Sequence, residues 1–392
     1  MQRVAVLGAT GSIGTSALDV LSRYPEDFCV YALAAGTRIE KLVGLAARFH
    51  PEVVGIADQE KVKALKDLLA ARGLQSIRVV AGAKDVASLA AESRVDTVLQ
   101  AVVGAAGLAP SFEAARAGKR LLLANKESVV CGASLLMETV KKGRATLLPI
   151  DSEHNAIFQC LHGASRDERK AARIWLTCSG GPFRDKKDLD LSKVTPEVAL
   201  SHPTWSMGKK ISIDSATLMN KGFEVIEARY LFDVPSERIR VVVHPQSVLH
   251  SMVEFSDGSV IGQMGPTDMR LAIAYCLGYP KRLVGTDVRL DFTQLGPLTF
   301  EAPDTARFPL LTHAYDALRA GGLATVVLNA ANEMAVGAFL NRAIRFTDIA
   351  RVCETMLRKV SGRAPTSLEE ILETDAAVRA QSAEEIARLS RL

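Results

Sequence analysis

The stretch VAVLGATGSIGTSALDVL, residues 4–21, sets three glycines between a short apolar run and a helix-like pattern. Gly8, Gly11 and Gly14 have the spacing Gly-x-x-Gly-x-x-Gly, directly between the first predicted strand and the first predicted helix. At such a junction the free N–H groups and the positive dipole end of the helix bind phosphate, and small residues let the ligand approach the main chain. The stretch therefore predicts a dinucleotide-binding loop. A glycine-eased turn without a ligand is the alternative.

The residues that follow repeat the same alternation of strand and helix. Between residues 3 and 150, apolar runs of four to six residues alternate with longer helical patterns. The runs are VAVLG, CVYALA, VVGIA, IRVVA, TVLQAV, RLLLAN and TLLPI. This rhythm is typical of a parallel sheet with crossover helices. We therefore expect an α/β fold whose residues 1–150 form a Rossmann-like, doubly wound parallel sheet that binds the cofactor.

The pattern changes after residue 150. Residues 151–285 mix strands and helices, and Asp257-Gly258 separates two alternating strands like a hairpin turn. We expect an α+β catalytic domain there. Residues 286–311 carry three prolines and little periodicity, which predicts a linker. Residues 312–392 contain helical patterns at 324–340 and 347–360, which predict a closing α-helical bundle.

Composition narrows the class of protein. A chain of 392 residues exceeds the size of a single ordinary core, so we expect two or three domains. No apolar run reaches the length of a membrane helix, and a strand begins directly after Met1, so we expect no membrane contact and no signal peptide. The six cysteines form no CxxC pair, which fits a reducing cytoplasm. A net charge of +4 without a basic, aromatic run predicts no nucleic-acid partner.

The end of the second apolar run bears on the choice of cofactor. NAD enzymes usually place an acidic residue there to hold the ribose hydroxyls. This chain has Gly36-Thr37-Arg38 instead, and Arg38 is suited to a 2′-phosphate, which favours NADP. The alternative is that Arg38 is a solvated residue at the start of a helix.

Two later strands deliver polar residues to the edge of the sheet where ligands of doubly wound folds lie. One is followed by Asn125, Lys126, Glu127 and Ser128, and the other by Asp151, Ser152, Glu153 and His154. Paired carboxylate oxygens from Asp151 and Glu153 attract a hard divalent cation such as Mg²⁺ or Mn²⁺. The alternative is simple capping of the helix that begins at this point.

A second polar set lies in IDSATLMNKGFEVIEARYLF, residues 213–232. On a helix, Asn220 and Glu224 share one face, with Lys221 close by, so Glu224 could complete the metal site; Glu227 lies near that face too. Hydroxyl, amide and ammonium groups suit a phosphate dianion, and Ser215, Asn220 and Lys221 offer them. Ser179 with Gly180 and Gly181 could form a further backbone concavity for an anion. An ordinary Lys–Glu surface pair is the alternative.

The segment SHPTWSMGKKIS, residues 201–212, sets Trp205 and Met207 among polar and flexible residues. Large apolar side chains in such a segment suit a lid that covers a ligand and excludes water. An interfacial loop is the alternative.

These motifs together resemble one enzyme family. GATGSIG, LANKES, PIDSEHNAIFQCL, SGGPFR, HPTWSMGKKISIDSATLMNKGFEVIEA, HPQSVLHSMVEF and NAANE occur in the order found in the 1-deoxy-D-xylulose 5-phosphate reductoisomerase family of the non-mevalonate isoprenoid pathway, from residue 1 to about 385. The resemblance implies a cytoplasmic homodimer that uses NADPH with Mg²⁺ or Mn²⁺, Co²⁺ being a further candidate.

The resemblance also implies roles for individual residues. The metal would be bound by Asp151, Glu153 and Glu224. The substrate would be held by Lys126, Ser152, Glu153, Ser179, His202, Ser215, Asn220, Lys221 and Glu224. NADPH would contact Thr10, Gly11, Ser12, Ile13, Gly36, Thr37, Arg38, Asn125, Glu127 and Gly208. Lys126, Asp151, Glu153, His202 and Glu224 would be catalytic. Many relatives have Asn in the loop after the second strand, where this chain has Arg38, so the resemblance fixes the cofactor rather than the contacts of its 2′-phosphate.

The implied reaction joins a metal-assisted carbon rearrangement, by retro-aldol and aldol steps or a ketol shift, to reduction of the resulting aldehyde by NADPH. Two other classes compete. A semialdehyde-type NADP dehydrogenase has a similar opening motif but needs a nucleophilic cysteine, for which Cys178 and Cys160 are the candidates. A redox-sensing NADP-binding protein would need no converging acids.

Overall fold

The structure, a computed structural model, describes residues 1–201, 208–359 and 363–390. Its contacts group the chain into two compact units. Unit 1 comprises residues 1–128, 136–155 and 268–288, and unit 2 comprises residues 129–135, 156–267 and 289–392. No helix in the described ranges combines the length and the apolar character that a bilayer crossing requires.

A seven-stranded parallel sheet forms the centre of unit 1, with the strand order β4-β3-β2-β1-β5-β6-β7. Its strands are β1 (Gln2–Leu7), β2 (Phe28–Ala35), β3 (Val53–Ile56), β4 (Arg78–Ala81), β5 (Thr97–Gln100), β6 (Arg120–Leu123) and β7 (Thr146–Pro149). The inner strands are buried almost along their whole length, as expected when helices cover both faces of a parallel sheet. Each of the seven predicted runs is a strand, so the predicted doubly wound sheet is confirmed.

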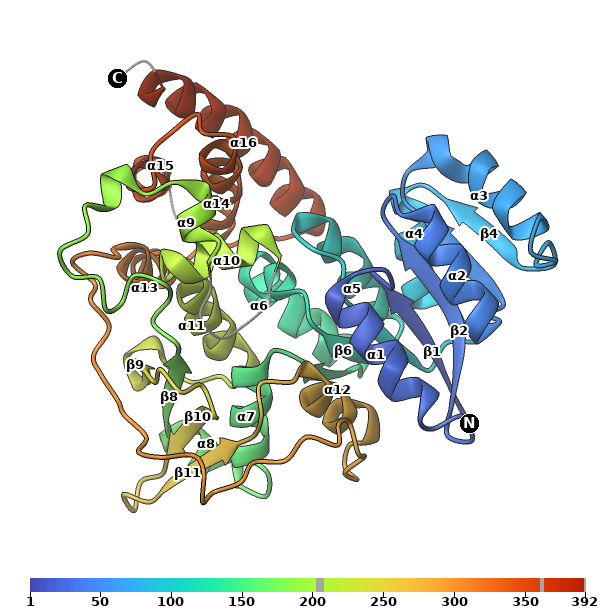
Figure 1. The fold of residues 1–392 in the computed structure, drawn as a ribbon, viewed down its shortest axis with the longest axis horizontal. Helices are drawn as coiled ribbons and strands as arrows, with labels where there is room; N and C mark the ends of the chain where they lie inside the picture. Colours follow the sequence, from blue (N-terminus) through green and yellow to red (C-terminus); the bar gives the residue numbers. More distant parts are fainter. Residues whose placement is uncertain (202–207, 360–362, 391–392) are drawn as a thin grey trace. The chain divides into compact units, whose positions relative to one another are not determined.

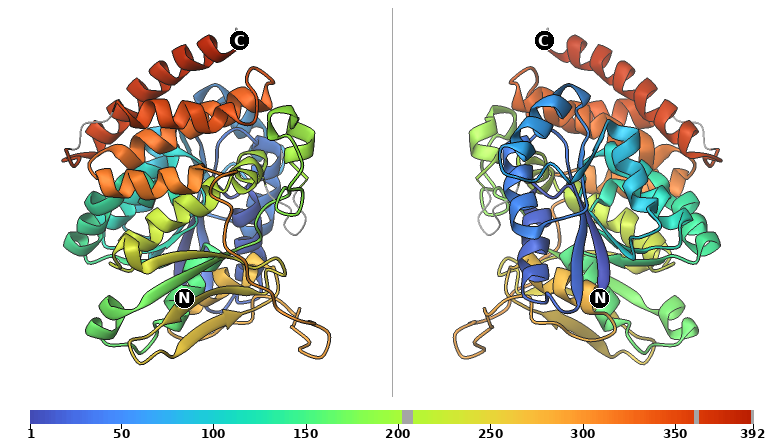
Figure 2. Two further views of the ribbon diagram at one scale, coloured as in Figure 1. Left: turned by 90° about the vertical axis from the view of Figure 1, so that its left-hand side faces the viewer. Right: turned by 90° about the vertical axis from the view of Figure 1, so that its right-hand side faces the viewer.

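Helices cover both faces of this sheet (Figure 2). They are α1 (Ser12–Ser22), α2 (Ile39–Phe49), α3 (Val62–Ala70), α4 (Ala83–Ser88), α5 (Leu108–Arg116) and α12 (Met269–Gly278), with short 3₁₀ turns at Gln59–Lys61, Leu89–Ala91 and Ala105–Gly107. Two more helices, α6 (Lys126–Gly143) and α7 (Ser152–Cys160), contribute residues to both units.

Helix α12 belongs to unit 1 although it comes more than a hundred residues after β7. It packs on α1 and β6. The Arg120 guanidinium at the start of β6 donates to the carbonyl oxygens of Cys276 and Leu277, which are among the last carbonyls of α12. Arg270 forms ion pairs with Asp268 at 2.7 Å and with Asp19 at 3.0 Å. The contacts thus place residues 268–288 with the first sheet, whereas the sequence pattern groups most of them with residues 151–285.

Unit 2 contains a four-stranded mixed sheet with the order β11-β10-β8-β9. Its strands are β8 (Arg173–Cys178), β9 (Ile239–Val243), β10 (Leu249–Glu254) and β11 (Val260–Met264). β10 and β11 are antiparallel, and Gly258 between them has a φ of 86°, as a tight hairpin turn requires. β8 and β9 are parallel. This is the α+β region expected from the sequence.

The helices of unit 2 are α8 (Arg166–Ala171), α9 (Pro196–Ala199), α10 (Lys209–Ala216), α11 (Met219–Leu231), α13 (Leu310–Ala320), α14 (Ala324–Leu340), α15 (Asp348–Leu357) and α16 (Leu368–Leu389), with 3₁₀ turns at Leu191–Lys193 and Ser236–Arg238. α14 packs on α13, α15 and α16, drawn in orange to red in Figure 1. The first half of α14 is buried on all sides, which a helix at the centre of a bundle requires. The predicted C-terminal helical region is confirmed.

Candidate active site

The glycine loop of unit 1 joins β1 to α1. Gly8 has a φ of 85°, and a Cβ atom at Gly14 would lie 2.4 Å from the Gly8 carbonyl oxygen. Gly11 is the N-cap of α1 and makes no side-chain cap bond, so the first N–H groups of the helix are not satisfied by a capping side chain. Ser12 and Ile13 begin that helix. The loop therefore brings main-chain donors to the point where the sequence predicts a pyrophosphate.

The second part of the predicted cofactor site follows β2. Gly36 and Thr37 form the turn, and Arg38 is the N-cap residue of α2, with an exposed side chain. Lys61 donates to the Thr37 carbonyl oxygen at 3.0 Å, so a second cation lies on this turn. Lys41 holds the first loop by donating to the Thr10 carbonyl oxygen at 2.9 Å. No acidic residue occupies the end of β2, and the turn is locally basic.

A third part lies where β6 meets α6. Asn125 caps α6 by accepting from the Ser128 N–H at 2.8 Å, and its amide donates to the Glu127 carboxylate at 2.9 Å and to the Val102 carbonyl at 2.7 Å. Asn125 and Glu127 are both buried. Because β1, β5 and β6 are neighbours and the strand order reverses between β1 and β5, these residues and the glycine loop lie at the switch point of the sheet.

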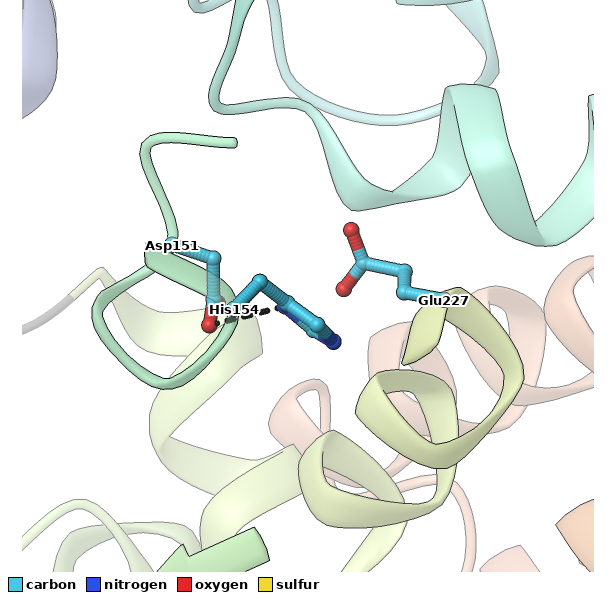
Figure 3. Close-up of side chains that lie close together, drawn as sticks. All are labelled: Asp151, His154 and Glu227. Atoms are coloured by element: carbon cyan, nitrogen blue, oxygen red, sulfur yellow. Dashed lines mark hydrogen bonds and ion pairs between the residues drawn. The ribbon is translucent and has the colours of Figure 1, made fainter. Parts of the chain in front are cut away.

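Asp151 stands at the centre of a polar cluster after β7. It forms an ion pair with Lys126, with 3.2 Å between Nζ and Oδ2. Its other oxygen contacts Nδ1 of the buried His154 at 3.1 Å, the bond drawn as a dashed line in Figure 3. The same oxygen accepts from the Glu153 N–H at 3.2 Å. Asp151 therefore does cap α7, but it also joins a lysine and a histidine that capping alone would not need.

Glu153 completes this cluster in unit 1. One of its carboxylate oxygens lies within 4.8 Å of one from Asp151, and Ser152 donates to Glu153. Two oxygen ligands of one Mg²⁺ lie at most about 4.2 Å apart, because each is about 2.1 Å from the ion. The two carboxylates are therefore near enough to bind the same divalent cation after at most a small side-chain adjustment. The two carboxylates are thus hard oxygen ligands, of the kind that the sequence predicts for a divalent cation at Asp151 and Glu153.

The polar set of unit 2 is buried, which excludes the surface-pair alternative. Lys221 and Glu224 are paired in α11, with side-chain exposures of 3% and 1%. Asn220 donates to Glu224 at 2.6 Å. Glu227, one turn further on, is also buried. Burying a lysine and two glutamates costs desolvation free energy, and apolar side chains at these positions would pack without that cost. Buried charged groups of this kind are typical of a functional site.

Ser179 and Ser215 are brought close through the main chain of unit 2. Ser179 follows β8 directly, and Gly181, with a φ of 73°, lies so near α10 that its Cβ atom would be 2.8 Å from the Ser215 carbonyl oxygen. Arg184 donates to the Ser179 carbonyl at 3.3 Å. A hydrogen bond from Arg184 to Asp185 raises the arginine pKa, so a permanent positive charge lies beside this turn.

The structure places Asn220 and Glu224 on one helix, as predicted, and divides the stretch 213–232 between two helices. α10 ends at Ala216 and α11 begins at Met219, because Leu218 adopts a left-handed conformation with a φ of 61°. Ser215 near the end of α10 and Asn220 and Lys221 at the start of α11 therefore flank one tight turn.

Four predicted residues come from the segment 201–212. Gly208 is the exposed N-cap residue of α10 in unit 2. His202, with the proposed lid residues Trp205 and Met207, lies outside the described residues. Asp214 and Asn332 have no predicted role, yet they are buried and hydrogen-bonded to each other from distant parts of unit 2. Their sequence signal is that each lies within one of the family motifs.

One competing interpretation makes a thiol the nucleophile. Burial raises the pKa of Cys160 to about 11, so this residue is a neutral thiol at physiological pH. That disfavours Cys160 as the catalytic group of a semialdehyde-type dehydrogenase.

Three family models match the chain. They are described as 1-deoxy-D-xylulose 5-phosphate reductoisomerase over residues 4–133, 1-deoxy-D-xylulose 5-phosphate reductoisomerase C-terminal domain over residues 147–232, and DXP reductoisomerase C-terminal domain over residues 264–381. The 1-deoxy-D-xylulose 5-phosphate reductoisomerases of Burkholderia pseudomallei (strain 668) and Burkholderia mallei (strain SAVP1) are each 51% identical over 378 residues, which is 96% of this chain and 95% of theirs.

Solved structures of reductoisomerases are similar to this chain along nearly its whole length. A DOX-P reductoisomerase in complex with NADPH, fosmidomycin and magnesium has a TM-score of 0.94 and 43% identity, over 98% of both chains. The 1-deoxy-D-xylulose 5-phosphate reductoisomerase of Zymomonas mobilis in complex with NADPH has a TM-score of 0.91 and 45% identity, over 98% of this chain and 99% of that one.

Proposed function

Because this chain belongs to the 1-deoxy-D-xylulose 5-phosphate reductoisomerase family, we propose that it converts 1-deoxy-D-xylulose 5-phosphate to 2-C-methyl-D-erythritol 4-phosphate, with NADPH and a divalent cation. The observation that carries the proposal is the pair of carboxylates Asp151 and Glu153, placed after β7 of the same sheet whose first loop fits a dinucleotide. The semialdehyde dehydrogenase and the redox sensor that the opening motif allowed are set aside by the family assignment.

The residues present fit the metal that relatives bind. Asp151 and Glu153 supply two hard oxygen ligands, and we propose Glu224 of α11 as the third. When bound, Mg²⁺ acts as a Lewis acid toward the oxygens of the keto-sugar and stabilises the charge that develops there. Asn220 and Lys221 hold the Glu224 carboxylate from within α11, which orients it for this role.

The residues present also fit NADPH. A Cβ atom at Gly14 would clash with the main chain of Gly8, so glycine permits the tight turn into α1. No side chain caps the first N–H groups of that helix, which can therefore bind a pyrophosphate. We propose that Thr10, Gly11, Ser12 and Ile13 contact the pyrophosphate, that Gly36, Thr37 and Arg38 contact the adenosine 2′-phosphate end, and that Asn125, Glu127 and Gly208 contact the remainder. We propose that the basic turn at Arg38 and Lys61 favours NADPH over NADH.

The substrate phosphate suits the polar turn of unit 2. Ser179, Ser215, Asn220 and Lys221 provide hydroxyl, amide and ammonium donors, and we propose that they bind this dianion. Ser152 and His202 are proposed to contact the sugar portion. Binding of a phosphate remote from the reacting carbons supplies free energy that positions them.

Lys126 is the proposed proton-handling group. Its ammonium lies 3.2 Å from Asp151 in a largely buried position, so it can stabilise an oxyanion of the substrate or transfer a proton to it without a competing solvent shell.

The direct test follows NADPH absorbance with 1-deoxy-D-xylulose 5-phosphate as the substrate. We expect NADPH consumption that EDTA abolishes and added Mg²⁺ restores. The product should be 2-C-methyl-D-erythritol 4-phosphate by mass and NMR. Consumption that survives exhaustive chelation, or reduction without rearrangement of the carbon chain, would exclude this function.

Finer features belong to the same proposal. We expect Mn²⁺ to replace Mg²⁺, because the ligands are hard oxygens. We propose a cytoplasmic homodimer in which the edge strand β11 takes part: Val260 and Ile261 on this strand are 52% and 49% exposed, and a free edge with apolar side chains favours strand pairing. Light scattering on the wild type and Ile261→Lys measures the oligomeric state.

A further inference from the structure

Helix α10 carries the proposed phosphate ligand Ser215, yet it has few apolar anchors. Its buried residues are Ser212, Ile213, Asp214 and Ala216, and of these only Ile213 is a sizeable apolar side chain. A helix of eight residues gains little stability by itself. Its orientation must therefore come from specific contacts with its neighbours.

Asp214 supplies such contacts from the centre of the buried face. It is 1% exposed, and each of its oxygens has a partner. Oδ2 pairs with Lys210 one turn earlier at 2.8 Å, and Oδ1 accepts from the Asn332 amide at 2.8 Å. Lys210 also lies over the ring of Phe223, 4.9 Å from its centroid, which ties α10 to α11.

Asn332 has a well-defined position because α14, which carries it, is also bound to α16. Asn332 is fully buried in the middle of α14. The next residue, Glu333, forms an ion pair with Arg379 of α16, and Arg379 also pairs with Asp375 at 2.6 Å. A satisfied buried polar contact of this kind selects one arrangement of two helices over others that apolar packing would tolerate.

The position of α10 determines where the phosphate ligands lie. Gly181 packs on the Ser215 carbonyl, so a displaced α10 would also disturb the turn after Ser179. The Thr217 hydroxyl donates to the Asp214 carbonyl at 3.2 Å and accepts from the Met219 N–H at 3.4 Å, which links the end of α10 to the start of α11. Misplacing ligands by about 1 Å is costly to binding and turnover.

We propose that Asp214 and Asn332 are positioning residues for the substrate phosphate: through their hydrogen bond, the C-terminal helical region sets the place of α10 and so of Ser215. The inference rests on the proposed function, because it takes Ser215 as a phosphate ligand. It gives the C-terminal helices a part in substrate binding, although none of the residues proposed to hold the substrate lies on them.

The test compares Asn332→Ala with Asn329→Ala. Asn329 is equally buried in the same helix and donates to Glu333 at 3.2 Å, with no hydrogen bond to α10 among the described residues, so it matches Asn332 in volume and burial. We expect Asn332→Ala to raise the KM for substrate and the inhibition constant of inorganic phosphate together by about tenfold, with NADPH affinity unchanged. Asn329→Ala should lower the melting temperature similarly and change neither constant.

Asp214→Asn approaches the same contact from α10 and covers the case in which Asn332→Ala does not fold. The new amide keeps the shape and can donate to Asn332 Oδ1, which has no hydrogen-bond partner within the described ranges. We expect a smaller rise in KM than Asp214→Ala gives. Equal effects of the two substitutions at Asp214, or equal effects of Asn332→Ala and Asn329→Ala, would overturn the inference.

A double-variant cycle with Ser215→Ala separates the inference from the function beneath it. If Asn332 acts through Ser215, then Asn332→Ala should raise the phosphate inhibition constant much less in the Ser215→Ala background. Additive effects would refute the positioning role alone. A Ser215→Ala variant with wild-type phosphate inhibition would refute the proposed phosphate contact, and the positioning role with it.

Discussion

Lys126 and Asp151, which are 25 residues apart in the chain, form an ion pair in which the side chains are only 10% and 16% exposed. They come from the ends of the neighbouring strands β6 and β7, so the parallel sheet itself brings them together. Because His154 and the Glu153 N–H share the other oxygen of Asp151, the carboxylate is fixed in direction before any ligand arrives.

Asp151→Asn and Glu224→Gln should each abolish turnover, because a neutral amide is a much weaker ligand for Mg²⁺ than a carboxylate. NADPH binding, measured by quenching of NADPH fluorescence, should persist in both variants. Asp190→Asn, at an exposed 3₁₀ cap, is the control and should keep wild-type activity. Near-normal turnover of either site variant with added Mn²⁺ would remove that residue from the metal site.

Gly181→Ala should weaken binding of the substrate phosphate. The new methyl group would meet the Ser215 carbonyl at 2.8 Å, and the φ of 73° is unfavourable for alanine by about 1–2 kcal/mol. Gly163→Ala is a matched control, since Gly163 has a φ of 84° and open space around its Cα. We expect Gly163→Ala to show the cost of the backbone strain alone in urea, and Gly181→Ala to lose more stability because of the added clash. Only Gly181→Ala should raise the KM, by roughly tenfold.

Arg38→Ala should reduce discrimination between NADPH and NADH. Loss of a charge-assisted hydrogen bond to the 2′-phosphate costs about 1.5–3 kcal/mol, so the Kd of NADPH should rise at least tenfold and that of NADH should stay the same. Arg48→Ala, in the last turn of the same helix, is the control. Titration with 2′,5′-ADP and with 5′-AMP gives the same comparison without catalysis, and an equal loss for both nucleotides would count against a 2′-phosphate contact.

Alkaline pH should destabilise the fold through Cys160. Burial raises the pKa of this thiol from 9.0 to about 11. The unfolded chain releases the proton first, so the stability that the neutral thiol contributes is complete below pH 9 and is lost as the pH rises to about 11. We expect a loss on the order of 1–2 kcal/mol in the free energy of unfolding. Urea titrations of Cys160→Ala should lack this component, whereas those of Cys29→Ala should retain it.

The first sheet could be predicted almost strand by strand, because each buried parallel strand is a short apolar run bounded by turn residues. The acids after β7 could also be recognised, since the ends of parallel strands lie at one edge. Both predictions depend on local pattern and on one general property of α/β sheets.

Other features depend on partners that no local pattern reveals. Asp214 and Asn332 are 118 residues apart, and each taken alone is an ordinary helix residue. The break at Leu218 lies in a run without glycine or proline, so nothing in the sequence marks it. Lys221 and Glu224 have the spacing of a surface pair, and only the packing of α11 shows that they are buried. The domain boundaries at residues 150, 285 and 311 remain a prediction. The contacts in the structure define two compact units.

The return of α12 to the first sheet has a consequence for biosynthesis. Until residues 268–288 have left the ribosome, Arg120 lacks its carbonyl partners and one flank of β6 and α1 is uncovered. At the usual pace of translation that delay lasts on the order of ten seconds after residue 155 is made. During that delay the nascent unit 1 keeps apolar surface of α1 and β6 exposed, because α12 has not yet been synthesised. A gene fragment that ends near codon 150 would encode unit 1 without α12 and would leave this surface uncovered.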